Sequence, residues 1–169
     1  MRLSKASLLG AALLALSLTA GSAAAQSKKV APGAETTEAA ASDLDRVAAI
    51  LQDMGYRAVA DSSSSPPSID SKFGGITTLI QLANCDEGTS NNCGILRFHA
   101  GFDLNEGLDL KSVNQWNLDK YFGRAYLDDE NDPHVDLVVS MVGISDESVK
   151  DHVEWWDWAI GAFKEHINW

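Results

Sequence analysis

A stripe of apolar residues near the C-terminus sets the strongest limit on the fold. Its members step along the chain by four, three, four, three and four positions: Val149, Val153, Trp156, Ile160, Phe163 and Ile167. At 100° per residue they share one side of a helix, so we predict a helix from Ser145 to Ile167. Ser145 suits the N-cap, and Asp146 and Glu147 favour the positive helix end. Such a long apolar face must be covered by a sheet.

Segments in which apolar residues alternate predict the strands of that sheet. Leu96, Phe98, Ala100 and Phe102 point to one face of a predicted strand, while Ile95, Arg97 and His99 point to the other. This strand, Gly94–Phe102, pairs with Ile76–Asn84 in a first predicted hairpin. The stretches Tyr121–Leu127 and Val135–Val142 form a second hairpin, because turn-forming residues fill the segment between them.

The remaining elements are shorter. We predict a helix over Ser42–Met54, a short strand over Tyr56–Ala60, a weak strand over Ile69–Phe73 and a helix over Asp109–Asn117. The expected fold class is α+β: a single domain with an antiparallel β-sheet of two hairpins plus short strands. The sheet packs against an N-terminal helix and a long C-terminal helix, and a short helix lies between the hairpins, in the order α-β-β-β-α-β-β-α.

The N-terminal residues have the pattern of a secretory signal peptide. Arg2 and Lys5 precede an apolar run over Leu8–Leu18, and an Ala-x-Ala cleavage site ends at Ala25. The alternative is a retained N-terminal anchor. We expect residues 1–25 to be a signal peptide, 26–41 a disordered linker and 42–169 the folded domain, and we expect the protein to be periplasmic or secreted.

The chain is acidic, with a formal net charge of −11. A surface of this sign repels phosphate backbones and anionic lipid headgroups. We therefore expect no nucleic-acid partner, and no membrane insertion once the signal peptide is removed. A protein partner or self-association remains open.

Cys85 and Cys93 are the two cysteines of the chain. An even count at short spacing in an exported chain predicts a disulfide, here across the turn of the first hairpin. The alternative is a metal pair, but zinc pairs prefer two to four intervening residues and need further ligands.

Motifs for catalysis or metal binding are absent from the sequence. It contains no Gly-x-Ser-x-Gly, and its four histidines, His99, His134, His152 and His166, lack the spacing of metal ligands. Asp128, Glu130 and Asp132 start like a calcium loop, but Pro133 takes the glycine position. We therefore predict no catalytic residue, no metal, no cofactor and no enzymatic activity.

The stretch from Asn114 to Asp128 holds the most distinctive residues: Trp116, Asn117, Phe122, Gly123, Arg124 and Tyr126. These residues resemble the motif of the YbjN family, whose fold is similar to that of type III secretion chaperones. The resemblance covers about Asp43 to Phe163. It implies a binding or regulatory domain without an assigned catalytic residue, and the signal peptide and disulfide would make this chain an exported variant.

Arg124 lies in the middle of a predicted strand among aromatic residues. A buried charge needs a partner, so we expect an ion pair with Asp136 or Asp128 across the hairpin. The alternative is recognition of a partner's carboxylate. Correspondingly, we predict a non-catalytic exported protein-binding or chaperone-like domain, with a small-ligand sensor that uses a cleft near Trp116 and Arg124 as the alternative.

Two further tryptophans cannot belong to the apolar stripe. On the helix predicted above, Trp158 lies about 180° from Val149 and Trp155 about 120° from it. Exposed tryptophans are favoured anchors at interfaces. We therefore expect Trp155 and Trp158 to contact a client protein or a second copy, unless a loop or the N-terminal segment covers them.

Overall fold

The fold is known from a computed structural model, which describes residues 41–169. The predicted signal peptide, and all of the predicted linker except Ala41, lie outside the described residues. No helix within residues 41–169 has the length and apolar character needed to cross a membrane.

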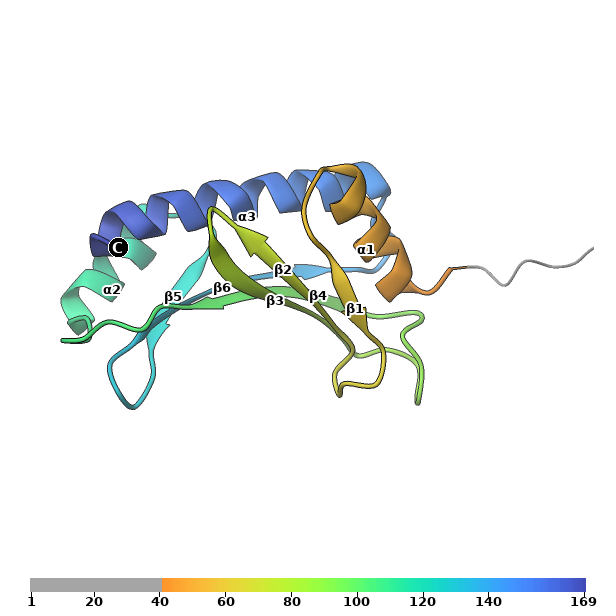
Figure 1. Cartoon of the computed structure of the whole chain (residues 1–169), viewed down its shortest axis with the longest axis horizontal. Coiled ribbons are helices and arrows are strands. Elements are labelled where there is room, and N and C mark those ends of the chain that lie inside the picture. The colour runs from red at the N-terminus through yellow and green to blue at the C-terminus, as the bar shows by residue number, and fades with distance from the viewer. Residues whose placement is uncertain (1–40) are drawn as a thin grey trace, which may run out of the picture. The chain divides into compact units, whose positions relative to one another are not determined.

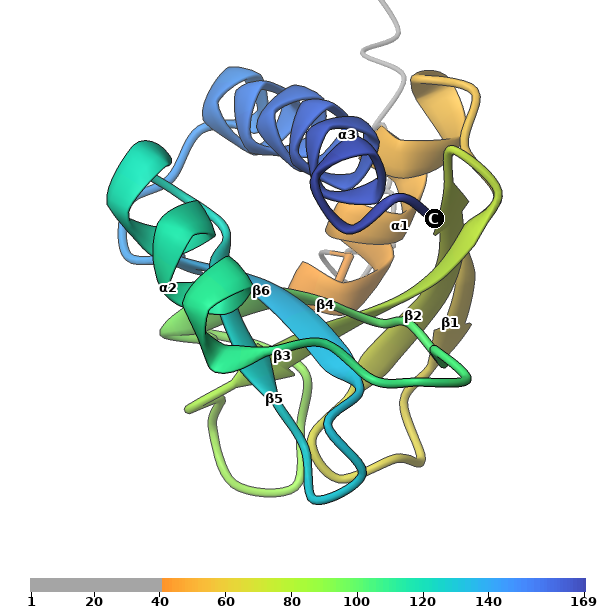
Figure 2. The same ribbon diagram turned by 90° about the vertical axis from the view of Figure 1, so that its left-hand side faces the viewer.

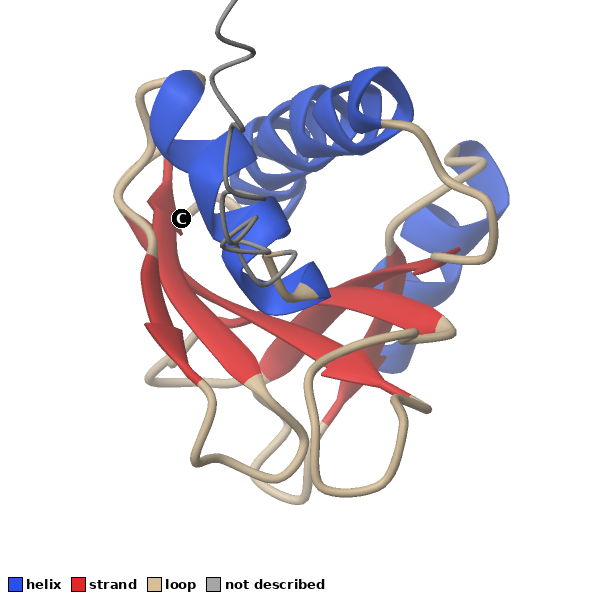
Figure 3. Cartoon of the chain, turned by 90° about the vertical axis from the view of Figure 1, so that its right-hand side faces the viewer, coloured by secondary structure: helices blue, strands red, loops and turns tan. Residues whose placement is uncertain are grey.

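Three helices cover one face of a six-stranded antiparallel sheet (Figures 1 and 2). In chain order the elements are α1 (Asp43–Asp53), β1 (Val59–Asp61), β2 (Ser68–Phe73), β3 (Ile76–Ala83), β4 (Ile95–Gly101), α2 (Leu110–Asp119), β5 (Arg124–Leu127), β6 (Pro133–Ser140) and α3 (Asp146–Ile167). The strands lie in the order β1-β2-β3-β4-β6-β5. In the described part of the chain, no helix covers the opposite face of the sheet (Figure 3).

The α+β fold class and the predicted alternation of helices and strands are confirmed. Both predicted hairpins form, because β3 pairs with β4 and β5 pairs with β6. Four strands lie between α1 and α2, as the four predicted ranges there indicate, although the order α-β-β-β-α-β-β-α counts three. The weak strand predicted over Ile69–Phe73 is β2, a full member of the sheet that pairs with both β1 and β3.

The core lies between α3 and the covered face of the sheet. All six residues of the predicted stripe are buried, and the Trp156 ring packs against Phe98 at 5.7 Å between centroids. The Trp156 indole also donates a hydrogen bond of 3.1 Å to the hydroxyl of Thr78. This bond satisfies two polar groups that would otherwise be unpaired in the core.

Each helix begins at the residue that the sequence indicates. The side chains of Ser42, Asp109 and Ser145 accept hydrogen bonds from backbone amides of the first turns of α1, α2 and α3. After α1, Gly55 has φ +88°, a left-handed conformation that glycine adopts at little cost.

The boundaries of three predicted strands were wrong. Of the strand predicted over Tyr56–Ala60, only Val59 and Ala60 belong to β1, while Tyr56 packs its ring against Phe73 at 4.4 Å between centroids. The strand predicted over Val135–Val142 is β6, which spans Pro133–Ser140. Likewise β5 begins at Arg124 and not at Tyr121. Gly123 has φ +80°, a left-handed conformation outside the extended region, so the strand begins only after it.

Cys85 and Cys93 form a disulfide at the turn between β3 and β4. The turn is also held by α1: the Asp43 amide donates to the Ser90 carbonyl at 3.0 Å, and the Asp43 carboxylate accepts from the Cys93 amide at 2.9 Å. The disulfide and α1 together fix this end of the sheet.

Candidate functional site

Two neighbouring features stand out at the β5 end of the sheet. The first is a polar cluster on the uncovered sheet face, which we define as Arg97, His99, Arg124, Tyr126, His134 and Asp136. The second is an aromatic surface, which we define as Phe122, Trp155 and Trp158. The two features meet at the loop from Lys120 to Gly123, which carries Phe122.

Asp136 is the centre of the polar cluster. Strand register places it directly opposite His99 on β4 and Arg124 on β5. Its carboxylate, 1 % exposed, accepts hydrogen bonds from Arg97 Nη2 at 2.9 and 3.0 Å, and from Arg124 Nη2 at 2.9 Å. The His99 Nδ1 lies 2.7 Å from Asp136 Oδ1. A buried carboxylate is stable here because each oxygen has cationic or hydrogen-bonding partners.

These partners decide the protonation of Asp136. Burial raises the pKa of the Asp136 carboxyl, but the hydrogen bonds from His99 and Arg97 and the charge of Arg97 outweigh burial and lower the pKa to about 2. Asp136 is therefore ionised at neutral pH and only accepts hydrogen bonds, so His99 Nδ1 carries the proton that it donates. A carboxylate with so low a pKa is a weak base, which is poorly suited to general base catalysis.

Three rings form a stack beside this carboxylate. His134 lies between Tyr126 and His99, with 5.2 Å between ring centroids on each side. Gly101 makes room for the stack, because a Cβ at that position would lie 2.7 Å from the His134 ring. Burial raises the pKa of the Tyr126 hydroxyl, and the negative charge of Asp136 raises it further, so this phenol stays protonated at neutral pH.

A shallow pocket of about 490 Å³ opens between the polar cluster and the loop before β5. It is lined by Arg97, Tyr121, Phe122, Gly123, Arg124, Asp136, Leu137 and Val138. The volume is within the range of small-molecule sites. The lining therefore combines two arginines with apolar side chains.

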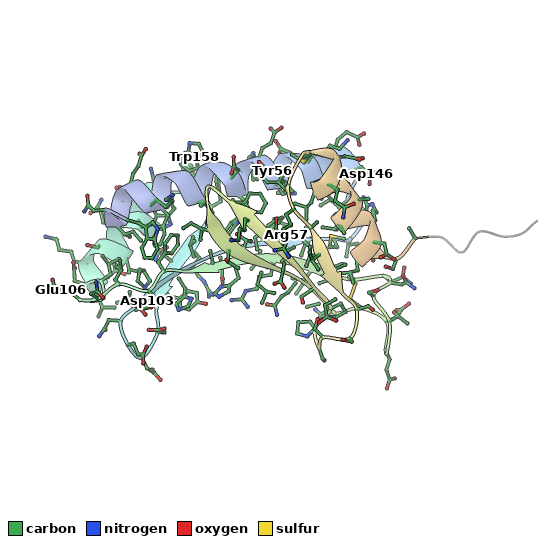
Figure 4. The ribbon with its side chains drawn as sticks, viewed as in Figure 1. Tyr56, Arg57, Asp103, Glu106, Asp146 and Trp158 are labelled. Atoms are coloured by element: carbon green, nitrogen blue, oxygen red, sulfur yellow. A yellow bond between two sulfur atoms is a disulfide. The ribbon has the colours of Figure 1, made fainter. Side chains whose placement is uncertain are left out.

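The aromatic surface is formed by the same loop and α3. Trp155 and Trp158 are 40 % and 52 % exposed on α3, where Figure 4 labels Trp158. The Phe122 ring packs against both, at 5.3 and 5.5 Å between ring centroids. The ammonium of Lys120 lies 5.3 Å from the centre of the Trp158 ring. The loop thus covers part of both tryptophans, as the alternative expected, and leaves about half of each in solvent.

The residues of the sequence motif hold β5 at the edge of the sheet. The Asn117 side chain accepts from the Ala125 amide at 2.8 Å and donates to the Ala125 carbonyl at 3.0 Å. It therefore occupies the hydrogen-bonding groups that a further strand would use. The indole of Trp116 donates to the Gly123 carbonyl and fixes the turn before the strand.

The expected cleft near Trp116 and Arg124 was only half correct. Trp116 is fully buried against Phe163 and does not line the pocket, because Gly123 and its turn lie over the indole. Arg124 does line the pocket, and its ion pair is with Asp136. Asp128, the other partner expected for Arg124, instead lies 3.1 Å from His134 Nε2.

Arg97, His99 and His134 were not predicted as site residues. The alternation of β4 places Arg97 and His99 on the face opposite Phe98, but the sequence does not show that β6 lies beside β4. That pairing brings Asp136 to them. No group of three or more His, Cys, Asp or Glu side chains within residues 41–169 is arranged to hold a metal ion.

Comparison with known proteins identifies a family. The model of the YbjN family, which is described as "Putative bacterial sensory transduction regulator", matches residues 43–169. No curated protein matches the chain.

Proposed function

The chain belongs to the YbjN family, and from that premise we propose that it is a non-catalytic, exported protein-binding domain with a chaperone-like role. The observation that carries this proposal is the aromatic surface. Phe122, Trp155 and Trp158 form one contiguous group of rings, of which the two tryptophans are about half exposed. Large aromatic side chains in such a position supply much of the binding energy at protein interfaces.

The surroundings of the rings indicate the chemistry of the partner. Asp151 and Glu154 are exposed on α3, each four residues before one of the tryptophans, so they flank the rings on the helix surface and outnumber the Lys120 ammonium beside Trp158. The net charge of −11 opposes self-association of two identical acidic surfaces. We therefore assign the surface to a protein segment that presents apolar and basic side chains.

The proposed export rests on the sequence and on the cysteines. The first 25 residues have the pattern of a signal peptide, and the Cys85–Cys93 disulfide fits an oxidising compartment. The proposed location is therefore the periplasm or the exterior of the cell. Measuring the intact mass of protein recovered from the periplasm tests this. We expect the mass of a chain that begins at Gln26 and has both cysteines in the disulfide form.

A labelled peptide rich in Leu and Lys tests the binding surface. We expect fluorescence anisotropy to show binding to the protein, and the Trp155→Ser/Trp158→Ser double variant to weaken it by at least ~10-fold, because both anchors are lost. Trp169→Ser is the matched control, since it removes a half-exposed tryptophan that packs on Phe102 elsewhere. A Leu- and Glu-rich peptide is expected to bind more weakly.

Two results would contradict the proposal. The first is equal affinity of the double variant and the Trp169→Ser control for the Leu- and Lys-rich peptide. The second is tighter binding of the Glu-rich peptide, which would remove the charge argument. Circular dichroism of each variant shows whether the fold is retained.

A second candidate function is that of a small-ligand sensor. It is favoured by one observation, the pocket beside Arg124, whose lining combines two arginines with apolar side chains. Because the Lys120–Gly123 loop lines this pocket and also carries Phe122 of the aromatic surface, a bound ligand would contact the loop that supports the protein-binding site.

A further inference from the structure

The pocket beside Arg124 carries more positive charge than its own residues neutralise. Arg97 and Arg124 both pair with Asp136, which is the one acidic residue among the eight that line the pocket. Two guanidinium groups and one carboxylate leave one positive charge. A pocket of this sign on a chain with net charge −11 favours an anionic ligand at this place over the rest of the surface.

Arg124 is placed to receive that ligand. Its side chain is 70 % exposed, and among the described residues its guanidinium donates one hydrogen bond, to Asp136 Oδ2. A guanidinium has five N–H donors, so further donors remain for an acceptor in the pocket. The Tyr126 ring lies 5.1 Å from the guanidinium carbon and helps to hold it in position.

The apolar residues of the pocket lining indicate what is attached to the anion. Phe122 is half-buried, Tyr121 is fully exposed, and Val138 is 54 % exposed on β6. These side chains offer apolar contact within the same pocket as the guanidinium. A small ligand with a charged end and an apolar end can therefore contact the guanidinium and these apolar side chains together.

We propose that this pocket binds a carboxylate that is attached to an apolar group. The inference names the ligand of the second candidate function and rests on it. A carboxylate has the single negative charge that the pocket leaves unbalanced, and its two oxygens match the planar fork of an arginine. The carboxylate can belong to a small organic acid or to the free C-terminus of a peptide.

Matched pairs of probes test this inference by NMR titration of the isotope-labelled protein. The probes are phenylpropionate and its amide, and acetyl-Leu-Phe with a free C-terminus and as the C-terminal amide. We expect both acids to shift the amide signals of Gly123, Arg124 and Val138, and both amides to bind at least ~10-fold more weakly, because they lack the charge-assisted hydrogen bonds. Tighter binding of the peptide acid would identify a peptide C-terminus as the source; equal binding would identify a small acid.

Three variants locate the binding site. Arg124→Gln removes the exposed donor and should weaken acid binding ~10- to 100-fold. Val138→Asp retains both arginines but neutralises the pocket, so it should weaken binding of the acids and not of the amides. Arg57→Gln makes the same chemical change at another exposed arginine (Figure 4) and should leave acid binding unchanged.

The possible failures are distinguishable. Equal binding of acid and amide at the pocket would overturn the carboxylate inference and leave the ligand-sensor function intact. Tighter binding of inorganic phosphate than of either acid would overturn it in favour of a general anion site. If no probe shifts the pocket signals while all variants remain folded, both the inference and the ligand-sensor function are wrong, and the aromatic surface is unaffected.

Discussion

Replacing Asp136 by Asn tests whether the polar cluster holds the uncovered face of the sheet together. The substitution keeps the size of the side chain but removes the negative charge shared by Arg97, His99 and Arg124. The depression of the Asp136 pKa from 3.8 to about 2 corresponds to about 2 kcal/mol of preference for the ionised form in the folded state. The ion pair with Arg124 contributes little to these 2 kcal/mol, because Arg124 is largely exposed and water can solvate its guanidinium when the carboxylate is removed.

Arg97 adds a further cost in the Asp136→Asn variant. Its side chain is two-thirds buried, and its guanidinium would lose a charged acceptor at 2.9 and 3.0 Å. We therefore expect the free energy of unfolding to fall by ~2–4 kcal/mol, which lowers the urea midpoint by about 1–2 M for a domain of this size. Asp70→Asn, an exposed carboxylate on β2, is the control and should change stability by less than about 0.5 kcal/mol. A loss below about 1 kcal/mol for Asp136→Asn would refute the account of the cluster.

Three other perturbations test the fold and the cluster. The stabilisation by ionised Asp136 is complete above about pH 4 and is lost as the pH falls through about 2. Urea melts at these two pH values should therefore show that the free energy of unfolding falls by about 2 kcal/mol more in the unmodified protein than in Asp136→Asn. An equal fall in both proteins would contradict this. Asn117→Ala removes both side-chain bonds to the edge strand and should cost ~1–3 kcal/mol and speed hydrogen exchange in β5; unchanged exchange would show that the bonds are dispensable. Reduction of the Cys85–Cys93 disulfide should lower stability by ~2–3 kcal/mol, measured by urea melts with and without reductant, whereas an equal midpoint would make the bond incidental.

Local sequence patterns predicted the elements whose structure depends on local rules. The periodicity of α3 identified all six of its buried stripe residues, and Ser42, Asp109 and Ser145 marked the three helix starts. Capping and amphipathicity act within a few residues of the chain, so they can be recognised without knowledge of the topology.

The polar cluster could not be predicted in the same way because it depends on strand order. The insertion of β6 between β4 and β5 brings Asp136 to both Arg97 and Arg124. The predicted hairpin offered Asp136 and Asp128 as partners of Arg124, and Asp136, on the next strand in sequence, forms the ion pair. The predicted hairpin did not include Arg97, whose strand is separated from β6 by α2 and β5.

The start of β5 shows a second limit of sequence patterns. Tyr121 and Phe122 have high strand propensity, yet they belong to the loop, since the left-handed turn at Gly123 and the bond from Trp116 redirect the chain. Tertiary contacts override propensity here. As a result, Phe122 packs on Trp155 and Trp158 and both sites share one loop.

Site-directed photocrosslinking in intact cells tests the proposed protein-binding surface most directly. A photoreactive benzoylphenylalanine would replace Trp158 in one strain and Trp169 in a matched strain, since both tryptophans are about half exposed. The account predicts a discrete crosslinked protein partner from position 158 that is absent from position 169 and is lost when Trp155→Ser is added. The absence of a crosslink from position 158, or the same crosslinked products from both positions, would contradict it.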